Sequence, residues 1–369
     1  MNPNVIRKLI HIDMDCFYAA VEMRDFPQYR DVALAVGGSE KQRGVISTCN
    51  YKAREFGVRS AMPTSRALQL CPNLVVIPGR MSVYKSVSAH IQQIFSRYTH
   101  LIEPLSLDEA YLDVTDCKQH HGSATLIAEA IRQDIWRELQ LTASAGVAPI
   151  KFLAKVASDI NKPNGLCVIP PEQVQSVVDK LPLEKIPGVG KVSLEKLHQA
   201  GFYYCEDIKN TDYIELLRRF GRLGESLWKR SHGIDLRQVV VERERKSVGV
   251  ERTFSQNIQS YEQCWQVIET QLYPELFSRL QRAYGDRDII KQGIKVKFAD
   301  FQLTTIEHGH TQLELEDFKN LLREILKRQK GREIRLLGLN VMLKPQEYSR
   351  QLSFLIPNDE RSDPQSGGY

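Results

Sequence analysis

The chain has 369 residues and a net charge of +5, so it can form about two to four compact domains and can bind nucleic acid without being strongly basic. Seven cysteines without a Cys-x-x-Cys pair argue against a zinc knuckle and for reduced thiols in the cytoplasm. No apolar run approaches the roughly 20 residues of a membrane span, so we expect a cytoplasmic protein without a membrane partner.

The first predicted element is a short strand over residues 8–12 that ends in acidic residues. Asp13 follows this strand directly, and residues 16–22 have the pattern of a helix start. The Asp13 carboxylate is therefore expected at a strand end.

Residues 16–78 are predicted to form a mostly helical, turn-rich insertion. On a helix that starts near Asn50, Tyr51 and Arg54 lie three residues apart and share one face. An arginine fork matches phosphate oxygens in a bidentate way, so this face is a candidate triphosphate site. The spacing is equally compatible with a solvated helix face.

Two adjacent acids, Asp108 and Glu109, interrupt an otherwise apolar, strand-like run over residues 102–114. A buried pair of like charges is costly unless cations neutralise it. Side chains alternate along a strand, so both acids reach one ion only if the backbone bends between them. Pro104 and Ser106 suit such a bend at a hairpin tip, although ordinary surface acids remain the alternative.

These acids become a metal site if the first strand lies beside the strand over residues 107–114. Asp13, Asp108 and Glu109 would then offer oxygen ligands alone, which favours magnesium or manganese over zinc. Two such ions about 3.5–4 Å apart are the usual device for phosphoryl transfer by in-line displacement.

The remainder of this domain is predicted from helical spacing over residues 83–98 and 122–139 and a strand over 142–147. The order strand, helix, hairpin, helix, strand is that of a ferredoxin-like sheet. A helix over 150–160 then leads to Lys162 and a proline turn, where a lysine is commonly just solvated.

Residues 171–235 are predicted to be a small helical domain. Gly188, Gly190 and Lys191 form a tight turn before a helix, which exposes backbone N–H groups to a phosphate. This is a helix-hairpin-helix signature, and an ordinary helix-to-helix turn is the alternative. Residues 236–245 are interpreted as an extended linker.

A second β-α-β-β-α-β succession follows the linker. Its strands are expected at 247–254, 293–298, 302–308 and 334–343, and its helices at 261–282 and 315–327. Beyond it, residues 351–356 place apolar side chains on a segment with no domain left to bury them, which is typical of a docking peptide.

Residues 12–18 together with 106–113 resemble the catalytic signature of Y-family DNA polymerases of the DinB type, and the similarity extends from Lys8 to about Leu355. The resemblance implies an α+β multidomain fold with a ferredoxin-like palm, an inserted fingers domain, a helical thumb with a helix-hairpin-helix, and a ferredoxin-like little finger. The expected bounds are palm 1–15 and 79–170, fingers 16–78, thumb 171–235, linker 236–245, little finger 246–345 and tail 346–369.

The resemblance also implies an activity, namely DNA-directed, template-dependent, low-fidelity translesion DNA synthesis by two-metal-ion nucleotidyl transfer. No stretch remains for a proofreading exonuclease once these domains are assigned. The implied partners are primer–template DNA, deoxynucleoside triphosphates and a bacterial sliding clamp, and we expect a monomer that uses two Mg²⁺ ions, with Mn²⁺ as a substitute.

The family's site roles transfer onto matching positions of this sequence. Asp13, Asp108 and Glu109 would be catalytic and, with the Met14 carbonyl, would hold the metals, while Tyr18 would be the steric gate against ribonucleotides. The remaining roles are triphosphate binding by Tyr51, Arg54 and Lys162; DNA binding by Gly188, Gly190 and Lys191; and clamp binding by Gln351, Leu352, Phe354 and Leu355. In the last group the order of Phe354 and Leu355 is the reverse of the usual one.

Two other functions compete with this interpretation. A nucleotide cyclase can use the same sheet and metals, but it has no use for a helix-hairpin-helix or a clamp peptide. A DNA-binding scaffold without catalysis would keep the fold alone. Primer-independent turnover of a triphosphate would favour the cyclase, and primer extension by the wild type and by Asp108→Ala separates the polymerase from the scaffold.

Overall fold

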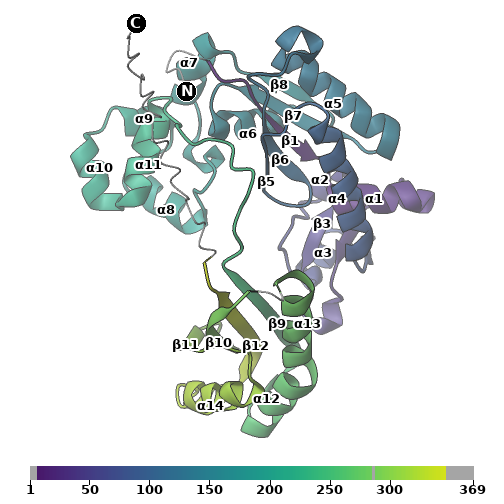
Figure 1. The fold of residues 1–369 in the computed structure, drawn as a ribbon, viewed down its shortest axis with the longest axis vertical. Helices are drawn as coiled ribbons and strands as arrows, with labels where there is room; N and C mark the ends of the chain where they lie inside the picture. The colour runs from purple at the N-terminus through teal and green to yellow at the C-terminus, as the bar shows by residue number, and fades with distance from the viewer. Residues whose placement is uncertain (1–5, 285–286, 346–369) are drawn as a thin grey trace, which may run out of the picture. The chain divides into compact units, whose positions relative to one another are not determined.

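The structure is a computed structural model that describes residues 6–284 and 287–345 (Figure 1). The chain forms two compact units. The first contains the described residues up to Arg243 together with Thr253–Ser255, and the second contains Glu244–Arg252 and the described residues from Gln256. Within the described ranges, no helix combines the length and the apolar character that crossing a membrane requires.

The first unit is built on a five-stranded sheet with the order β5-β6-β1-β7-β8. Its central strand β1 (Leu9–Met14) pairs antiparallel with β6 (Glu109–Asp113) on one side and β7 (Ala143–Ala148) on the other. The short strands β5 (Ile102–Pro104) and β8 (Leu166–Val168) complete the edges. The predicted order of strand, helix, hairpin, helix and strand is confirmed, and β8 is an addition to it.

The two faces of this sheet carry different cores. Helices α4 (Met81–Ser96) and α5 (Ala124–Leu139) pack on the face that presents Ile10 and Ile12. Helix α6 (Lys151–Ile160) packs on the other face with Leu9 and Tyr111. Because side chains alternate along β1, His11 and Asp13 share the face of Leu9 and lie beneath α6.

The insertion after β1 contains a second sheet with the order β3-β2-β4. Its strands are β2 (Leu34–Gly37), β3 (Ile46–Cys49) and β4 (Val75–Ile77), and its helices are α1 (Phe17–Asp25), α2 (Tyr51–Glu55) and α3 (Thr64–Leu70). The three helices agree with the predicted helical character of the insertion. The sequence did not indicate the strands, because strands of three or four residues are too short to show a period. The predicted helix start is confirmed, since the Asn50 side chain caps α2 by accepting from the Ala53 N–H.

A helical region follows β8 and shares a core with α6. It comprises α7 (Val174–Asp179), α8 (Lys191–Gln199), α9 (Cys205–Lys209), α10 (Tyr213–Phe220) and α11 (Arg222–Ser231). Residues 234–246 then carry neither helix nor strand, as the sequence predicts for 236–245.

The second unit has the predicted β-α-β-β-α-β succession. Its elements are β9 (Ser247–Ile258), α12 (Tyr261–Val267), α13 (Tyr273–Tyr284), β10 (Ile289–Phe298), β11 (Leu303–Gly309), α14 (Leu315–Leu326) and β12 (Ile334–Leu343). A π-helical turn at Ile268–Leu272 joins α12 to α13. The strand order β11-β10-β12-β9 puts β9, the first strand of this unit, at an edge of its sheet. In the five-stranded sheet of the first unit, the first strand β1 is central.

Candidate active site

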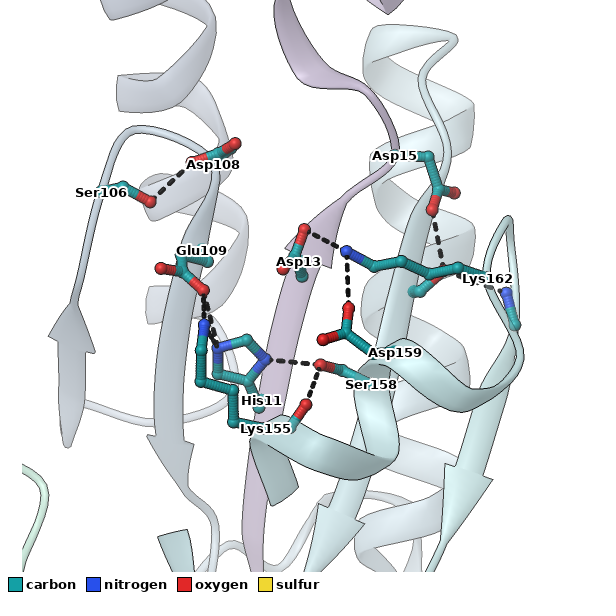
Figure 2. Close-up of polar contacts among 12 residues, drawn as sticks. His11, Asp13, Asp15, Ser106, Asp108, Glu109, Lys155, Ser158, Asp159 and Lys162 are labelled. Atoms are coloured by element: carbon teal, nitrogen blue, oxygen red, sulfur yellow. Dashed lines mark hydrogen bonds and ion pairs between the residues drawn. The ribbon is translucent and has the colours of Figure 1, made fainter. Parts of the chain in front are cut away.

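The strand register brings two of the three predicted acids together. The Cα atoms of Asp13 in β1 and Glu109 in β6 are direct partners across the antiparallel ladder. Asp108 lies in the turn between β5 and β6, where its carbonyl accepts from the Met14 N–H at 2.9 Å. The predicted bend is therefore present, and it sends the two side chains apart, with Asp108 turned toward Ser106 and Glu109 toward α6 (Figure 2).

Glu109 is held by a cluster of polar groups from β1 and α6. It accepts a hydrogen bond from the Lys155 ammonium, and its Oε2 atom lies 3.2 Å from His11 Nε2. The His11 ring is fully buried, and its Nδ1 atom lies 2.8 Å from Ser158 Oγ. Burial opposes ionisation of Glu109, but hydrogen bonds from His11 and Lys155 outweigh it and lower its pKa to about 2. Glu109 is therefore a permanent negative charge.

Asp13 is in the opposite electrostatic situation. Burial raises the pKa of Asp13 to about 6, although the positive charge of Lys162 favours the ionised carboxylate and so acts to lower this pKa. Lys162 Nζ lies 2.6 Å from Asp13 Oδ1 and 3.2 Å from Asp159 Oδ1. The negative charges of Glu109 and Asp108 add repulsion at Asp13. The site carries more carboxylates than ammonium groups, so an additional cation would stabilise it.

The donor atoms suit a hard divalent cation. His11, Asp13 and Glu109 each offer a ligand atom, and these atoms lie within 4.8 Å of one another. Carboxylate oxygens are the ligands that Mg²⁺ and Mn²⁺ prefer, and a buried carboxylate with a raised pKa gains most from a nearby positive charge. The residues present therefore fit a hard divalent cation. Asp108 is not one of these three residues, and it lines a pocket with Asp13 and Met14 instead.

One pocket gathers most of the predicted catalytic and nucleotide-binding residues. It has a volume of about 270 Å³, and its lining includes Asp13, Met14, Tyr18, Arg54, Asp108 and Lys162. Glu109 is not part of this lining, and neither is Tyr51. Its hydroxyl donates to Asp15 Oδ1 at 3.3 Å, and the Arg54 guanidinium lies 4.7 Å from the centre of its ring.

The Tyr18 ring is fixed by a second tyrosine. It stacks on Tyr84 with 4.3 Å between ring centroids and 14° between ring planes. Tyr84 is fully buried, and its hydroxyl donates to Glu22 Oε1 at 2.6 Å, while Arg80 Nε donates to the same oxygen at 2.9 Å. This anchored stack sets how far the Tyr18 ring extends into the pocket.

The predicted helix-hairpin-helix turn lies at the start of α8. Gly190 is the N-cap residue, Gly188 has φ +96°, and the Lys191 side chain is 90% exposed. A Cβ atom at Gly190 would meet no heavy atom within 4 Å, so the internal packing does not require glycine there. The turn is held from behind by Arg230, which donates to the Pro187 carbonyl at 2.6 Å.

Sequence reasoning missed the groups that hold the acids. His11 lies two residues before Asp13 and so shares its strand face, which was a usable signal. Lys155 is a cation inside the apolar run of residues 152–157, another available signal. Asp15 is buried, and nothing in its local sequence indicated a partner. The predicted clamp-binding residues Gln351, Leu352, Phe354 and Leu355 lie outside the described residues.

Comparison with protein families gives matches along most of the chain. The impB/mucB/samB family matches residues 12–159, and its C-terminal domain matches residues 245–354. The thumb domain of DNA polymerase-iota matches residues 184–235. DNA polymerase IV of Vibrio parahaemolyticus is 80% identical over 349 residues, which cover 95% of this chain and 99% of that protein. DNA polymerase IV of Vibrio cholerae is 73% identical over 354 residues, covering 96% and 98%.

Solved structures support the same relationship. The Y-family DNA polymerase chimera Dbh-Dpo4-Dbh aligns with a TM-score of 0.81 at 30% identity, covering 91% of this chain and 98% of the chimera. The insertion ternary complex of Dbh DNA polymerase aligns with a TM-score of 0.64, also at 30% identity and over the same shares of both chains. The chain therefore belongs to the impB/mucB/samB family of Y-family DNA polymerases and is a DNA-directed DNA polymerase of the DinB type.

Proposed function

We propose that this chain carries out template-dependent, low-fidelity translesion DNA synthesis by two-metal-ion nucleotidyl transfer, without a proofreading exonuclease. The observation that supports this most directly is the single pocket lined by Asp13, Tyr18, Arg54, Asp108 and Lys162. It combines acids, cations and an aromatic ring, which are the groups that a polymerase needs for metals, phosphates and sugar. The primer 3′-hydroxyl would displace pyrophosphate from the α-phosphorus of a deoxynucleoside triphosphate.

The metals would be held by Asp13, Asp108, Glu109 and the Met14 carbonyl, with Mg²⁺ preferred and Mn²⁺ as a substitute. When bound, the two ions would supply Lewis-acid stabilisation of the attacking and leaving oxygens. The low pKa of Glu109 keeps this ligand ionised under all ordinary conditions. Lys155 and His11 hold the Glu109 carboxylate in place, so the ligand does not have to be ordered when substrate arrives.

The phosphates would be neutralised by Tyr51, Arg54 and Lys162. Arg54 and Lys162 line the pocket, and in the nucleotide-free chain the Lys162 ammonium is paired with Asp13. The phosphate oxygens of a triphosphate are negatively charged like the Asp13 carboxylate. The Lys162 ammonium has three N–H donors, so it can contact both the phosphates and Asp13. The Tyr18 ring, backed by Tyr84, would leave no room for a 2′-hydroxyl on the sugar.

The domain roles are proposed with the bounds predicted from the sequence. Primer–template DNA would be held by the thumb turn at Gly188, Gly190 and Lys191. These three residues are exposed and lead into the N-terminus of α8, which suits a phosphate. The little-finger sheet would add contacts to the phosphate backbone of the DNA through Lys295 and Lys297, which alternate with buried residues along β10. We propose that a monomer performs the reaction.

Primer extension by the wild type and by Asp108→Ala tests the proposed mechanism. Alanine removes a carboxylate from the pocket wall, so extension should fall below detection while duplex binding persists. Extension that survives the substitution would rule out the metal assignment. Turnover of a triphosphate without primer would favour the nucleotide cyclase instead, and a 3′→5′ exonuclease assay on the same primer tests the expected lack of proofreading.

The tail is proposed to dock on the sliding clamp through Gln351, Leu352, Phe354 and Leu355. Deletion of residues 351–356 is expected to abolish clamp binding and to leave basal primer extension unchanged, because none of these residues is a proposed ligand of the metals, the nucleotide or the DNA. Surface plasmon resonance against the clamp measures the first effect. Retained clamp affinity would show that another segment makes the contact.

A further inference from the structure

Asp15 is a buried carboxylate that the proposed reaction does not use. Its residue exposure is 2%, and it lies two positions beyond Asp13 in the chain. Its Oδ1 atom accepts from Ser144 Oγ at 2.8 Å and from the Tyr51 hydroxyl at 3.3 Å, and its Oδ2 atom accepts from the Asn164 N–H at 2.8 Å. Burial of a polar group is costly without hydrogen-bond partners, and these donors replace the water that the Asp15 side chain gives up.

These donors come from three separate parts of the first unit. Tyr51 is the first residue of α2, Ser144 lies in β7, and Asn164 lies in the turn after α6, two residues beyond Lys162. Tyr51 and Lys162 are two of the proposed triphosphate ligands. Asp15 therefore contacts both segments that carry them, although it is not among the residues that line the pocket.

The turn that carries Lys162 is also held from its other side. Arg132 of α5 donates through Nη2 to the Asn164 carbonyl at 2.5 Å and to its Oδ1 at 2.7 Å. The Gly165 N–H donates to Ser144 Oγ at 3.3 Å, which is the same hydroxyl that donates to Asp15. A Cβ at Gly165 would lie 1.9 Å from the Asn161 carbonyl oxygen, so the turn is tightly closed. Asp15 is the inner anchor of a turn with little room to move.

We propose that Asp15 is a positioning residue for triphosphate binding. Its buried carboxylate holds two segments in place through hydrogen bonds, namely Tyr51 at the start of α2 and the turn after α6 that carries Lys162. This inference rests on the proposed roles of Tyr51 and Lys162. Asp15 acts through the geometry of its hydrogen bonds and is not a metal ligand. Groups ordered before the substrate arrives lose less entropy on binding, so the effect falls on nucleotide affinity.

The test is single-turnover incorporation of one nucleotide at rising dNTP concentration, which separates the half-saturating concentration from the maximal rate. Asp15→Ala removes the carboxylate that accepts all three hydrogen bonds, and the half-saturating concentration is expected to rise about tenfold, with primer–template affinity unchanged. Asp15→Asn can turn its amide oxygen to the Asn164 N–H and donate to both hydroxyls, so its expected rise is at most about threefold. This rescue separates positioning from metal ligation, because an amide does not replace a carboxylate on the metal.

Two further variants complete the design. Asp31→Ala removes an aspartate of the same unit whose side chain is 96% exposed, and it is expected to behave as the wild type. The Arg132 guanidinium bridges two segments, because Nε donates to the Ala143 carbonyl while Nη2 donates to Asn164. Arg132→Lys keeps a positive charge but loses this two-nitrogen bridge, so it should raise the half-saturating concentration in the same direction as Asp15→Ala. Circular dichroism melting shows which variants are folded. If Asp15→Ala does not fold, the half-saturating concentration of Arg132→Lys provides the test.

The outcomes distinguish this inference from the proposed function. If Lys162→Ala and Tyr51→Phe weaken nucleotide binding while folded Asp15→Ala and Arg132→Lys do not, the positioning role is overturned and the proposed function stands. If Asp15→Asn is as impaired as Asp15→Ala, charge rather than geometry matters, and the positioning role is again overturned. If neither Lys162→Ala nor Tyr51→Phe weakens binding, the proposed triphosphate roles fail, and this inference fails with them.

Discussion

An Asp13→Asn variant is expected to extend primers about a thousandfold more slowly than the wild type, or worse, while it keeps its affinity for primer–template DNA. Asp13 lies opposite Glu109 in the strand register and pairs with Lys162 in the pocket. An amide of the same size removes the negative charge that the proposed metals need and leaves the fold in place. Single-turnover extension measures the rate, and fluorescence anisotropy with labelled duplex measures the binding.

A matched control and a second readout make this prediction specific. Asp159 contacts the same Lys162 ammonium at 3.2 Å, but its side chain is 61% exposed and it is not a proposed metal ligand. Asp159→Asn is therefore expected to stay within about threefold of the wild-type rate, since exposed ion pairs contribute little. Binding of Mn²⁺, followed by electron paramagnetic resonance, should weaken for Asp13→Asn alone. Full extension by Asp13→Asn would refute its role as a ligand.

Asp13→Asn is also expected to leave the free energy of unfolding unchanged or to raise it. Burial raises the pKa of Asp13 from 3.8 to about 6, so the folded chain binds this proton more tightly than the unfolded chain does. The ionised carboxylate therefore lowers stability above about pH 6, and this penalty disappears as the pH falls to 3.8. An amide has no such penalty. At neutral pH without divalent cations, Asp13→Asn should melt no lower than the wild type by calorimetry.

The parts of the site that follow from local sequence could be predicted. The strand before Asp13 and the hairpin around Asp108 have local signals, namely an apolar run that ends in an acid and a proline followed by polar turn residues. These signals locate both acids, but they meet only if the two strands are neighbours, which the sequence analysis had to assume. The strand register supplies this pairing and places Asp13 opposite Glu109.

The remaining parts depend on contacts between distant segments. The partners of Glu109 come from β1 and α6, and those of Asp15 come from α2, β7 and the turn after α6, so no single stretch contains the information. The strand order of the second unit is a similar case. The succession of its elements can be predicted, but the position of β9 at an edge depends on how the strands pair, which the periodicity does not encode.

A Tyr18→Ala variant is expected to lose about a hundredfold of its discrimination against ribonucleotides, because a steric filter acts only while the ring occupies the space of the 2′-hydroxyl. The Tyr18 ring is held by its stack on Tyr84, with 4.3 Å between centroids, and Tyr84 is anchored to Glu22. Alanine removes the ring without touching the acids of the site. The ratio of incorporation efficiencies for a deoxynucleotide and the matching ribonucleotide measures the effect.

The control is Tyr18→Phe, which keeps the ring and its stack on Tyr84 and loses only the hydroxyl oxygen. If the gate is steric, this variant should discriminate within about threefold of the wild type. The rate for the correct deoxynucleotide should fall much less than the discrimination does in Tyr18→Ala, because the metal and phosphate ligands are unchanged. Undiminished discrimination in Tyr18→Ala would show that another group screens the sugar, and equal loss in both variants would show that the hydroxyl, rather than the ring, is responsible.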